Sequence, residues 1–168
     1  MPWARQIRAA SPEAPVEVAR LDLADLASVR EFAAAWTAAH PDGLDVLVNN
    51  VGVAYPGALY FDPTELDKDA PGLRERLVAV NVRATTEMTS LLLPPMIGKG
   101  RGAIINITTF ATFEPDPLFP TSGVARAGLA AFTKLFADKY APQGIRMNNI
   151  LPGFINSLPE KAEFRARI

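Results

Sequence analysis

Three side chains in the second half of the chain have the spacing of a proton-transfer site, although none of them transfers protons readily. Ser122 follows Thr109 by 13 residues, and Arg126 follows Ser122 by one helical turn, so the latter two share a face if the stretch is helical. A serine hydroxyl has no useful acidity near neutral pH, and a guanidinium is effectively never deprotonated. The spacing therefore predicts an enzyme-like site, whereas the side chains predict weak acid–base chemistry.

Composition limits the classes of protein and of site. The 168 residues are 49% hydrophobic and 21% charged, which predicts one globular domain, residues 1–168, with a single core. The formal net charge of -1 and the lack of Lys/Arg runs argue against a nucleic acid or an anionic membrane as the partner. There is no cysteine, and the one histidine, His40, precedes Pro41 at a helix end, so no metal site is predicted. The amino end lacks an apolar signal core, which favours a soluble, cytoplasmic protein.

Hydrophobic periodicity predicts strands that alternate with helices. The predicted strands are Val16–Asp22, Asp45–Asn49, Ala103–Thr108 and Ile145–Ile150, and the predicted helices are Leu26–His40, Gly72–Leu93, Ser122–Tyr140 and Glu160–Ile168. Pro94 and Pro95 are expected to end the second helix, and the proline-rich stretch 110–121 is expected to form no regular element. This alternation predicts an α/β fold with a parallel sheet that binds ligands beyond the carboxyl ends of its strands.

Four motifs in this order resemble those of the short-chain dehydrogenase/reductase family, from Val16 onward. They are Leu21-Asp-Leu-Ala-Asp25, Asn49-Asn-Val-Gly52, Ala79-Val-Asn-Val82 and Pro152-Gly-Phe-Ile-Asn-Ser157. The stretch Asn49–Ile107 resembles the steroid and long-chain 3-oxoacyl reductases of the family, and the sequence from Thr108 onward resembles its bacterial 3-oxoacyl-carrier-protein reductases. The resemblance implies a Rossmann-like, doubly wound parallel sheet in three α/β/α layers, and hydride transfer between NAD or NADP and a small carbonyl or alcohol substrate.

The resemblance also implies a role for each residue that matches a family motif. Thr109 takes the place of the catalytic serine, Ser122 that of the tyrosine and Arg126 that of the lysine, while Asn81 would hold a water of the proton relay. The cofactor contacts that it implies are made by Asp22, Leu23, Asn50, Val51, Gly52, Pro152, Gly153, Ile155 and Ser157. Among these, the Asp22 carboxylate would accept a hydrogen bond from the adenine amino group.

One family element has no counterpart in the sequence. The family begins with a strand, a Gly-x-x-x-Gly-x-Gly turn and a helix that faces the pyrophosphate, and no such segment precedes Val16. The glycine cluster 98–102 precedes a strand, so it is interpreted as a turn. We therefore expect a scaffold that lacks the first βαβ phosphate-binding unit and is also short at its carboxyl end. Since the family's sheet order is 3-2-1-4-5-6-7, Val16–Asp22 would then pair with Asp45–Asn49 or be poorly ordered.

Two functions remain open at this point. One is an oxidoreductase for 3-oxoacyl or ketone substrates with slow or absent turnover. The other is a catalytically inactive relative that binds partners and forms dimers or tetramers through helices 72–93 and 122–140. The residues could also be the interior of a longer protein, and neither the substrate nor NAD against NADP is determined.

Several single residues carry a structural interpretation beside the functional one. Asp22 and Ser122 could each cap the helix that follows them, and Arg126 could be a surface cation. His40 is interpreted as structural, and Trp36, Phe132 and Phe136 as core.

Overall fold

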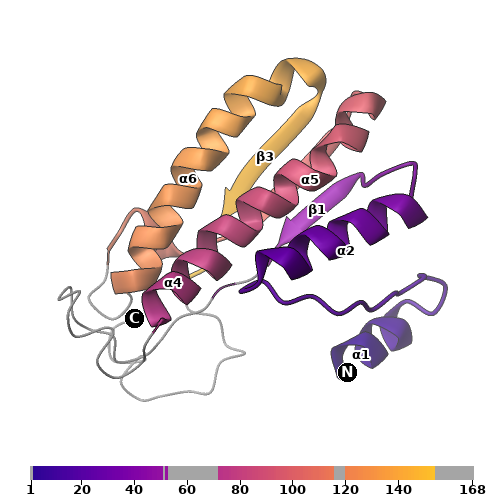
Figure 1. Cartoon of the computed structure of the whole chain (residues 1–168), viewed down its shortest axis with the longest axis horizontal. Coiled ribbons are helices and arrows are strands. Elements are labelled where there is room, and N and C mark those ends of the chain that lie inside the picture. Colours follow the sequence, from indigo (N-terminus) through magenta and orange to yellow (C-terminus); the bar gives the residue numbers. More distant parts are fainter. Residues whose placement is uncertain (1, 51, 53–71, 116–119, 154–168) are drawn as a thin grey trace.

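The computed structural model of the chain describes residues 2–50, 52, 72–115 and 120–153 (Figure 1). Its elements, in chain order, are α1 (Pro2–Ala10), α2 (Leu26–Ala39), β1 (Val46–Asn49), α4 (Leu73–Val78), the π-helical turn η1 (Ala79–Arg83), α5 (Ala84–Lys99), β2 (Gly102–Ile107), the 3-10 turn η2 (Phe110–Thr112), α6 (Pro120–Tyr140), the 3-10 turn η3 (Ala141–Gln143) and β3 (Ile145–Ile150). The predicted helix 160–168 lies outside the described residues. No described helix is long and apolar enough to cross a membrane.

The three strands form one parallel sheet in the order β1-β2-β3. Helices α2, α5 and α6 lie side by side on one face of this sheet (Figure 1). For α5 and α6 this follows from right-handed crossovers, because each of them connects two neighbouring parallel strands. The predicted α/β, partly Rossmann-like parallel sheet is thus confirmed. Of the three predicted layers, the described residues form two, and on the open face Val46 and Val48 are 48% and 53% exposed.

Two apolar clusters hold the helices on the sheet. One joins α5 and α6 to β2 and β3, and its buried members are Leu93, Met96, Ile104, Phe136, Ile145 and Met147. The other joins α2 to α5, and its buried members are Val29, Ala33, Ala84, Met88 and Leu92. Phe132 and Trp36 pack against these clusters, which confirms the predicted core positions. The His40 ring stacks on Trp36 with 4.5 Å between ring centroids, in keeping with a structural role.

The predicted strand Val16–Asp22 is wrong, because these residues form no strand. Within the described residues β1 pairs only with β2, so the expected pairing with Asp45–Asn49 is also absent. A strand needs a neighbour for its backbone hydrogen bonds, and this segment has none in the described sheet. Leu21 and Leu23 instead pack against the cluster between α2 and α5.

Two helix boundaries differ from the sequence prediction. α5 continues through Pro94 and Pro95 to Lys99 and ends at Gly100, whose φ is +66°. The two prolines deprive the carbonyls of Ser90 and Leu91 of donors, but these residues are exposed to solvent, and the buried Leu93 and Met96 hold the last turns on the sheet.

At the other boundary, α6 begins at Pro120, since proline is well suited to the first turn of a helix. Ser122 therefore lies inside α6, and its predicted role as the N-cap is wrong. Within the glycine cluster 98–102, Gly98 lies in the last turn of α5, Gly100 forms the predicted turn and Gly102 begins β2.

Candidate active site

Three residues that the sequence singled out meet beyond the carboxyl end of the sheet. Gly52 follows β1, Asn81 is the middle residue of η1 and is fully buried, and Arg126 lies on α6. A Cβ atom built on Gly52 would overlap the Arg126 Nη2 atom and would lie 3.3 Å from Asn81 Oδ1. The glycine therefore allows the guanidinium and the carboxamide to approach the backbone of this loop. The π-helical turn at Asn81 is a feature that recurs at functional sites.

Arg126 is buried although it carries a charge. The side chain is 6% exposed, and its Nη1 donates a hydrogen bond to the Ile107 carbonyl oxygen, 3.1 Å away, at the end of β2. Desolvation by burial lowers the pKa of the Arg126 guanidinium below its ordinary value. The group still remains positive near neutral pH, because an arginine starts from a very high pKa. The interpretation of Arg126 as a surface cation is therefore wrong.

Thr109 lies shortly after the end of β2 and is the N-cap of η2. Its Oγ1 accepts a hydrogen bond from the Ala111 backbone N–H at 3.4 Å, and its carbonyl accepts one from the Thr112 hydroxyl at 2.7 Å. Because the Thr109 hydroxyl is an acceptor in this contact, it retains its own proton for donation. The residue is partly buried and can present this hydroxyl to a carbonyl oxygen.

The amino end of α6 is packed against η2. A Cβ atom built on Gly123 would lie only 3.1 Å from the Ala111 carbonyl oxygen. The backbone of Ser122, the residue before this glycine, is thereby brought near the segment that follows Thr109. The helical spacing predicted for Ser122 and Arg126 is confirmed, because both lie within α6 one turn apart.

The residues predicted to contact a cofactor follow several strand ends. Asn50 follows β1, and Pro152 and Gly153 follow β3, where the Pro152 carbonyl accepts a hydrogen bond from the Phe110 N–H at 3.2 Å. Val51, Ile155 and Ser157 lie outside the described residues.

Asp22 does not cap α2. Its Oδ1 accepts from the Ala24 N–H at 2.9 Å within its own turn. The N-cap is Asp25, whose carboxylate accepts from the Ala27 N–H at 2.8 Å. The interpretation of Asp22 as a helix cap is therefore wrong, and the residue remains exposed before the helix.

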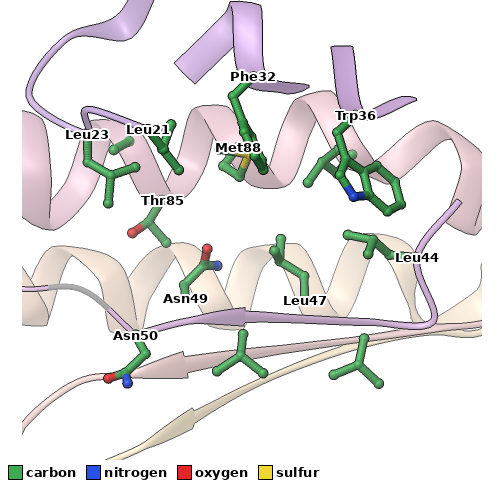
Figure 2. Close-up of a pocket in the computed structure, with 14 residues that line it drawn as sticks. Leu21, Leu23, Phe32, Trp36, Leu44, Leu47, Asn49, Asn50, Thr85 and Met88 are labelled. Carbon is green, nitrogen blue, oxygen red and sulfur yellow. The ribbon is translucent and has the colours of Figure 1, made fainter. Parts of the chain in front are cut away.

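A cavity of about 270 Å³ lies between α2, α5 and β1 (Figure 2). The lining is mostly apolar, with Trp36 and Leu44 at one end and Asn50, Thr85 and Leu23 at the other. Two of the predicted cofactor contacts, Leu23 and Asn50, therefore border the same cavity. The cavity runs beside β1, whose outer edge pairs with no other described strand.

Sequence reasoning missed a set of buried polar residues beneath the site. Asn106 in β2 and Thr133 in α6 are 0% and 7% exposed, and they are hydrogen bonded to each other at 3.0 Å. Asparagine is disfavoured in strands, yet each of the three strands contains at least one. The recurrence of asparagine in all three strands was the sequence signal that could have revealed these buried polar residues. Among the described residues, no group of three or more histidine, aspartate or glutamate side chains could hold a metal ion.

Comparison with known proteins gives consistent matches. A family model for short chain dehydrogenases matches residues 2–167. Very-long-chain 3-oxoacyl-CoA reductase from Anas platyrhynchos is 32% identical over 117 residues, which are 68% of this chain and 36% of that relative. The 3-oxoacyl-[acyl-carrier-protein] reductase of Thermotoga maritima is 33% identical over 124 residues, 71% of this chain and 48% of the relative. The matched region thus spans about a third to a half of these curated relatives.

Solved structures show the same similarity. The structure of a metagenomic short-chain oxidoreductase in complex with NADP superposes with a TM-score of 0.77 at 30% identity, covering 92% of this chain and 65% of that one. A short-chain dehydrogenase from Streptomyces avermitilis gives a TM-score of 0.76 at 30% identity, covering 94% of this chain and 55% of that one.

Proposed function

Because the chain belongs to the short-chain dehydrogenase family, we propose that it is an NAD(P)-dependent oxidoreductase acting on a carbonyl or alcohol of the 3-oxoacyl or ketone class. The observation that carries this proposal is the meeting of Gly52, Asn81 and Arg126 beyond the sheet. The 3-oxoacyl reductases among the similar proteins support the substrate class. A cytoplasmic location is part of the same proposal.

In this proposal the described residues would hold the nicotinamide and ribose end of the cofactor. Gly52 leaves room for the Arg126 guanidinium against this loop, and the guanidinium carries several N–H donors suited to ribose hydroxyls. Pro152 and Gly153 would meet the nicotinamide, and Asp22 and Leu23 the adenine. When bound, the cofactor supplies or accepts the hydride. The described residues include no glycine-rich turn that follows a strand and leads into a helix, so none of them is assigned to the pyrophosphate.

Each side chain of the site has a limited part in the chemistry. Thr109 donates a hydrogen bond from its hydroxyl to the substrate oxygen and so orients it, without giving up the proton. Arg126 supplies a fixed positive charge that stabilises negative charge on that oxygen, but it cannot pass a proton on. Ser122 is shorter than a tyrosine and much less acidic, so it would act only through a water, and Asn81 would hold such a water. We therefore expect turnover well below the rates of about 1–10³ per second that are typical of enzymes.

Two measurements on the purified protein test this function. Titration of NADH and NADPH followed by nicotinamide fluorescence should show saturable binding, and absorbance assays with ketones and 3-oxoacyl thioesters should show slow oxidation of the bound cofactor. The variant Arg126→Met should weaken binding, because it removes the guanidinium. A wild-type protein that binds neither cofactor would refute the proposal.

A second candidate function is that of a non-catalytic protein that assembles through its helices. It is favoured by the outer face of α6, where Val124 and Leu135 are 65% and 70% exposed, and by Leu91 and Ile97 on α5, which are 36% and 37% exposed. Where exposed apolar side chains gather into one contiguous patch, they mark a surface that another protein can cover. We propose a homodimer or homotetramer through helices 72–93 and 122–140.

Light scattering separates this candidate from the first. The wild type should be an oligomer whether or not cofactor is present, and Leu135→Lys should be a monomer. A monomeric wild type would exclude the second function. An oligomer with saturable cofactor binding would be compatible with the first.

A further inference from the structure

A row of asparagine side chains crosses the sheet beneath the site. Asn49, Asn106 and Asn149 lie opposite one another in the register of β1, β2 and β3. The Asn49 Nδ2 donates to Asn106 Oδ1 at 2.8 Å, and the Asn106 Nδ2 donates to Asn149 Oδ1 at 3.2 Å. We call these three residues the asparagine ladder.

The ladder is bonded to α6 through Thr133. The Asn106 Nδ2 also donates to Thr133 Oγ1 at 3.0 Å, so both of its hydrogens are used. The single Thr133 hydroxyl proton is shared between the Leu129 carbonyl and Asn149 Oδ1, each 2.9 Å away. A reversed Asn106 amide would place donor against donor at Asn49 and acceptor against acceptor at Asn149. The contacts are therefore directional, and they define how α6 sits over β2 more sharply than apolar packing alone.

The ladder is related to the site by a constant offset along the chain. Asn49 precedes Gly52 by three residues, Asn106 precedes Thr109 by three, and Asn149 precedes Pro152 by three. The same short length of chain therefore separates each ladder asparagine from the site residue that follows it.

Thr133 is related to the site in the same way along the helix. It follows Arg126 by seven residues, about two turns of α6, so the two side chains share a face. Arg126 in turn donates to Ile107, the residue next to Asn106. The place of the guanidinium is thus defined at two points on β2, one of which is the ladder.

We propose that the asparagine ladder and Thr133 are positioning residues that set where the Arg126 guanidinium lies relative to Gly52 and Asn81. The hydrogen bond from Arg126 to Ile107 is 3.1 Å long, and a slide of α6 by about 1 Å would break it. Apolar contacts permit such slides more readily than directional hydrogen bonds do. This inference rests on the proposed function only where cofactor affinity is measured.

Isosteric substitution at Thr133 tests the positioning role. Thr133→Val removes the hydroxyl and keeps the shape, while Thr133→Ser keeps the hydroxyl. The matched control is Thr86→Val, which removes a comparable hydroxyl-to-carbonyl hydrogen bond, from Thr86 Oγ1 to the Arg83 oxygen at 3.1 Å. The readouts are the side-chain ¹⁵N–¹H signals of Arg126 in NMR and the NADPH affinity. Thr133→Val should shift those signals and weaken NADPH binding about tenfold, Thr133→Ser should restore both, and Thr86→Val should change neither.

The outcomes separate this proposal from the proposed function. Arg126 signals that are unchanged in a folded Thr133→Val protein would overturn the positioning role, even if its melting temperature fell. If Thr133→Val does not fold, Asn149→Ala decides in its place, because it removes the hydrogen bonds from Asn106 and Thr133 to Asn149 Oδ1. It should shift the Arg126 signals, and unchanged signals would overturn the positioning role. A wild type with affinity for neither NADH nor NADPH would defeat the proposed function, and the Arg126 signals would still decide the positioning role.

Discussion

Substitution of Gly52 by alanine should disturb the site through a single methyl group. The new Cβ atom would overlap Arg126 Nη2 and lie 3.3 Å from Asn81 Oδ1, so the guanidinium would have to move. The backbone of Gly52 does not itself require glycine, because its φ is not among the positive values of the chain. Any effect of the substitution therefore reports on the contact with Arg126.

The expected cost follows from what Arg126 would lose. Its Nη1 hydrogen bond to the Ile107 carbonyl is charge-assisted, and the side chain is 6% exposed, so water replaces that contact poorly. Loss of a hydrogen bond to a charged group costs about 1.5–3 kcal/mol. We expect the free energy of unfolding to fall by about 2 kcal/mol, which lowers the melting temperature of a domain of this size by about 4–8 °C.

Thermal and urea unfolding followed by circular dichroism measure this effect. Gly128→Ala is the matched control, because Gly128 lies in α6 with open space around its Cβ position, and this variant should gain about 0.5–1 kcal/mol. In an Arg126→Ala background, Gly52→Ala should cost almost nothing, which gives a coupling energy of about 2 kcal/mol in the double-mutant cycle. The reasoning is refuted if Gly52→Ala costs the same in both backgrounds.

Three further substitutions test other parts of the fold. Asn106→Ala leaves the buried partners of that amide unsatisfied and should lower the free energy of unfolding by about 2–4 kcal/mol in urea unfolding. The control Asn148→Ala, on the open face, should change it by no more than about 0.5 kcal/mol. Equal losses in the two variants would contradict the ladder. Gly144→Ala should lower the melting temperature more than Gly100→Ala. Both glycines have a positive φ, but only a Cβ atom on Gly144 would overlap a backbone oxygen, that of Gly100. The reverse order would be evidence against this close contact between the two turns. Asp25→Ala removes the N-cap of α2 and should cost about 1 kcal/mol in urea unfolding, and an unchanged midpoint would show that the cap is dispensable.

Most elements could be predicted because their signals are local. The apolar run before Asn49 and the alternation around Met147 gave β1 and β3, and the apolar spacing from Leu26 to the His40–Pro41 end gave α2. The identity of the candidate site residues came from motifs of the family, which occupy short stretches of sequence. Local composition and motif spacing thus determined the α/β class, the order of the elements and the position of Arg126 one turn after Ser122.

The failures occurred where a residue depends on distant partners. Val16–Asp22 has the alternation of a strand, but no described strand lies beside it to accept its hydrogen bonds. Pro94 and Pro95 should end a helix by local rules, yet burial of Leu93 and Met96 continues α5 past them.

The sequence by itself determined which residues stand after each strand, and only the tertiary structure decided what they touch. Gly52 and Arg126 are far apart along the chain, and their contact depends on how α6 lies over β2. Of the three ladder asparagines only Asn49 belongs to a quoted motif, and the three become a ladder only through the parallel register of the sheet. Burial and hydrogen bonding between distant segments are properties of the packed chain. They explain why Arg126, a residue type usually found at the surface, is a buried charge near Asn81.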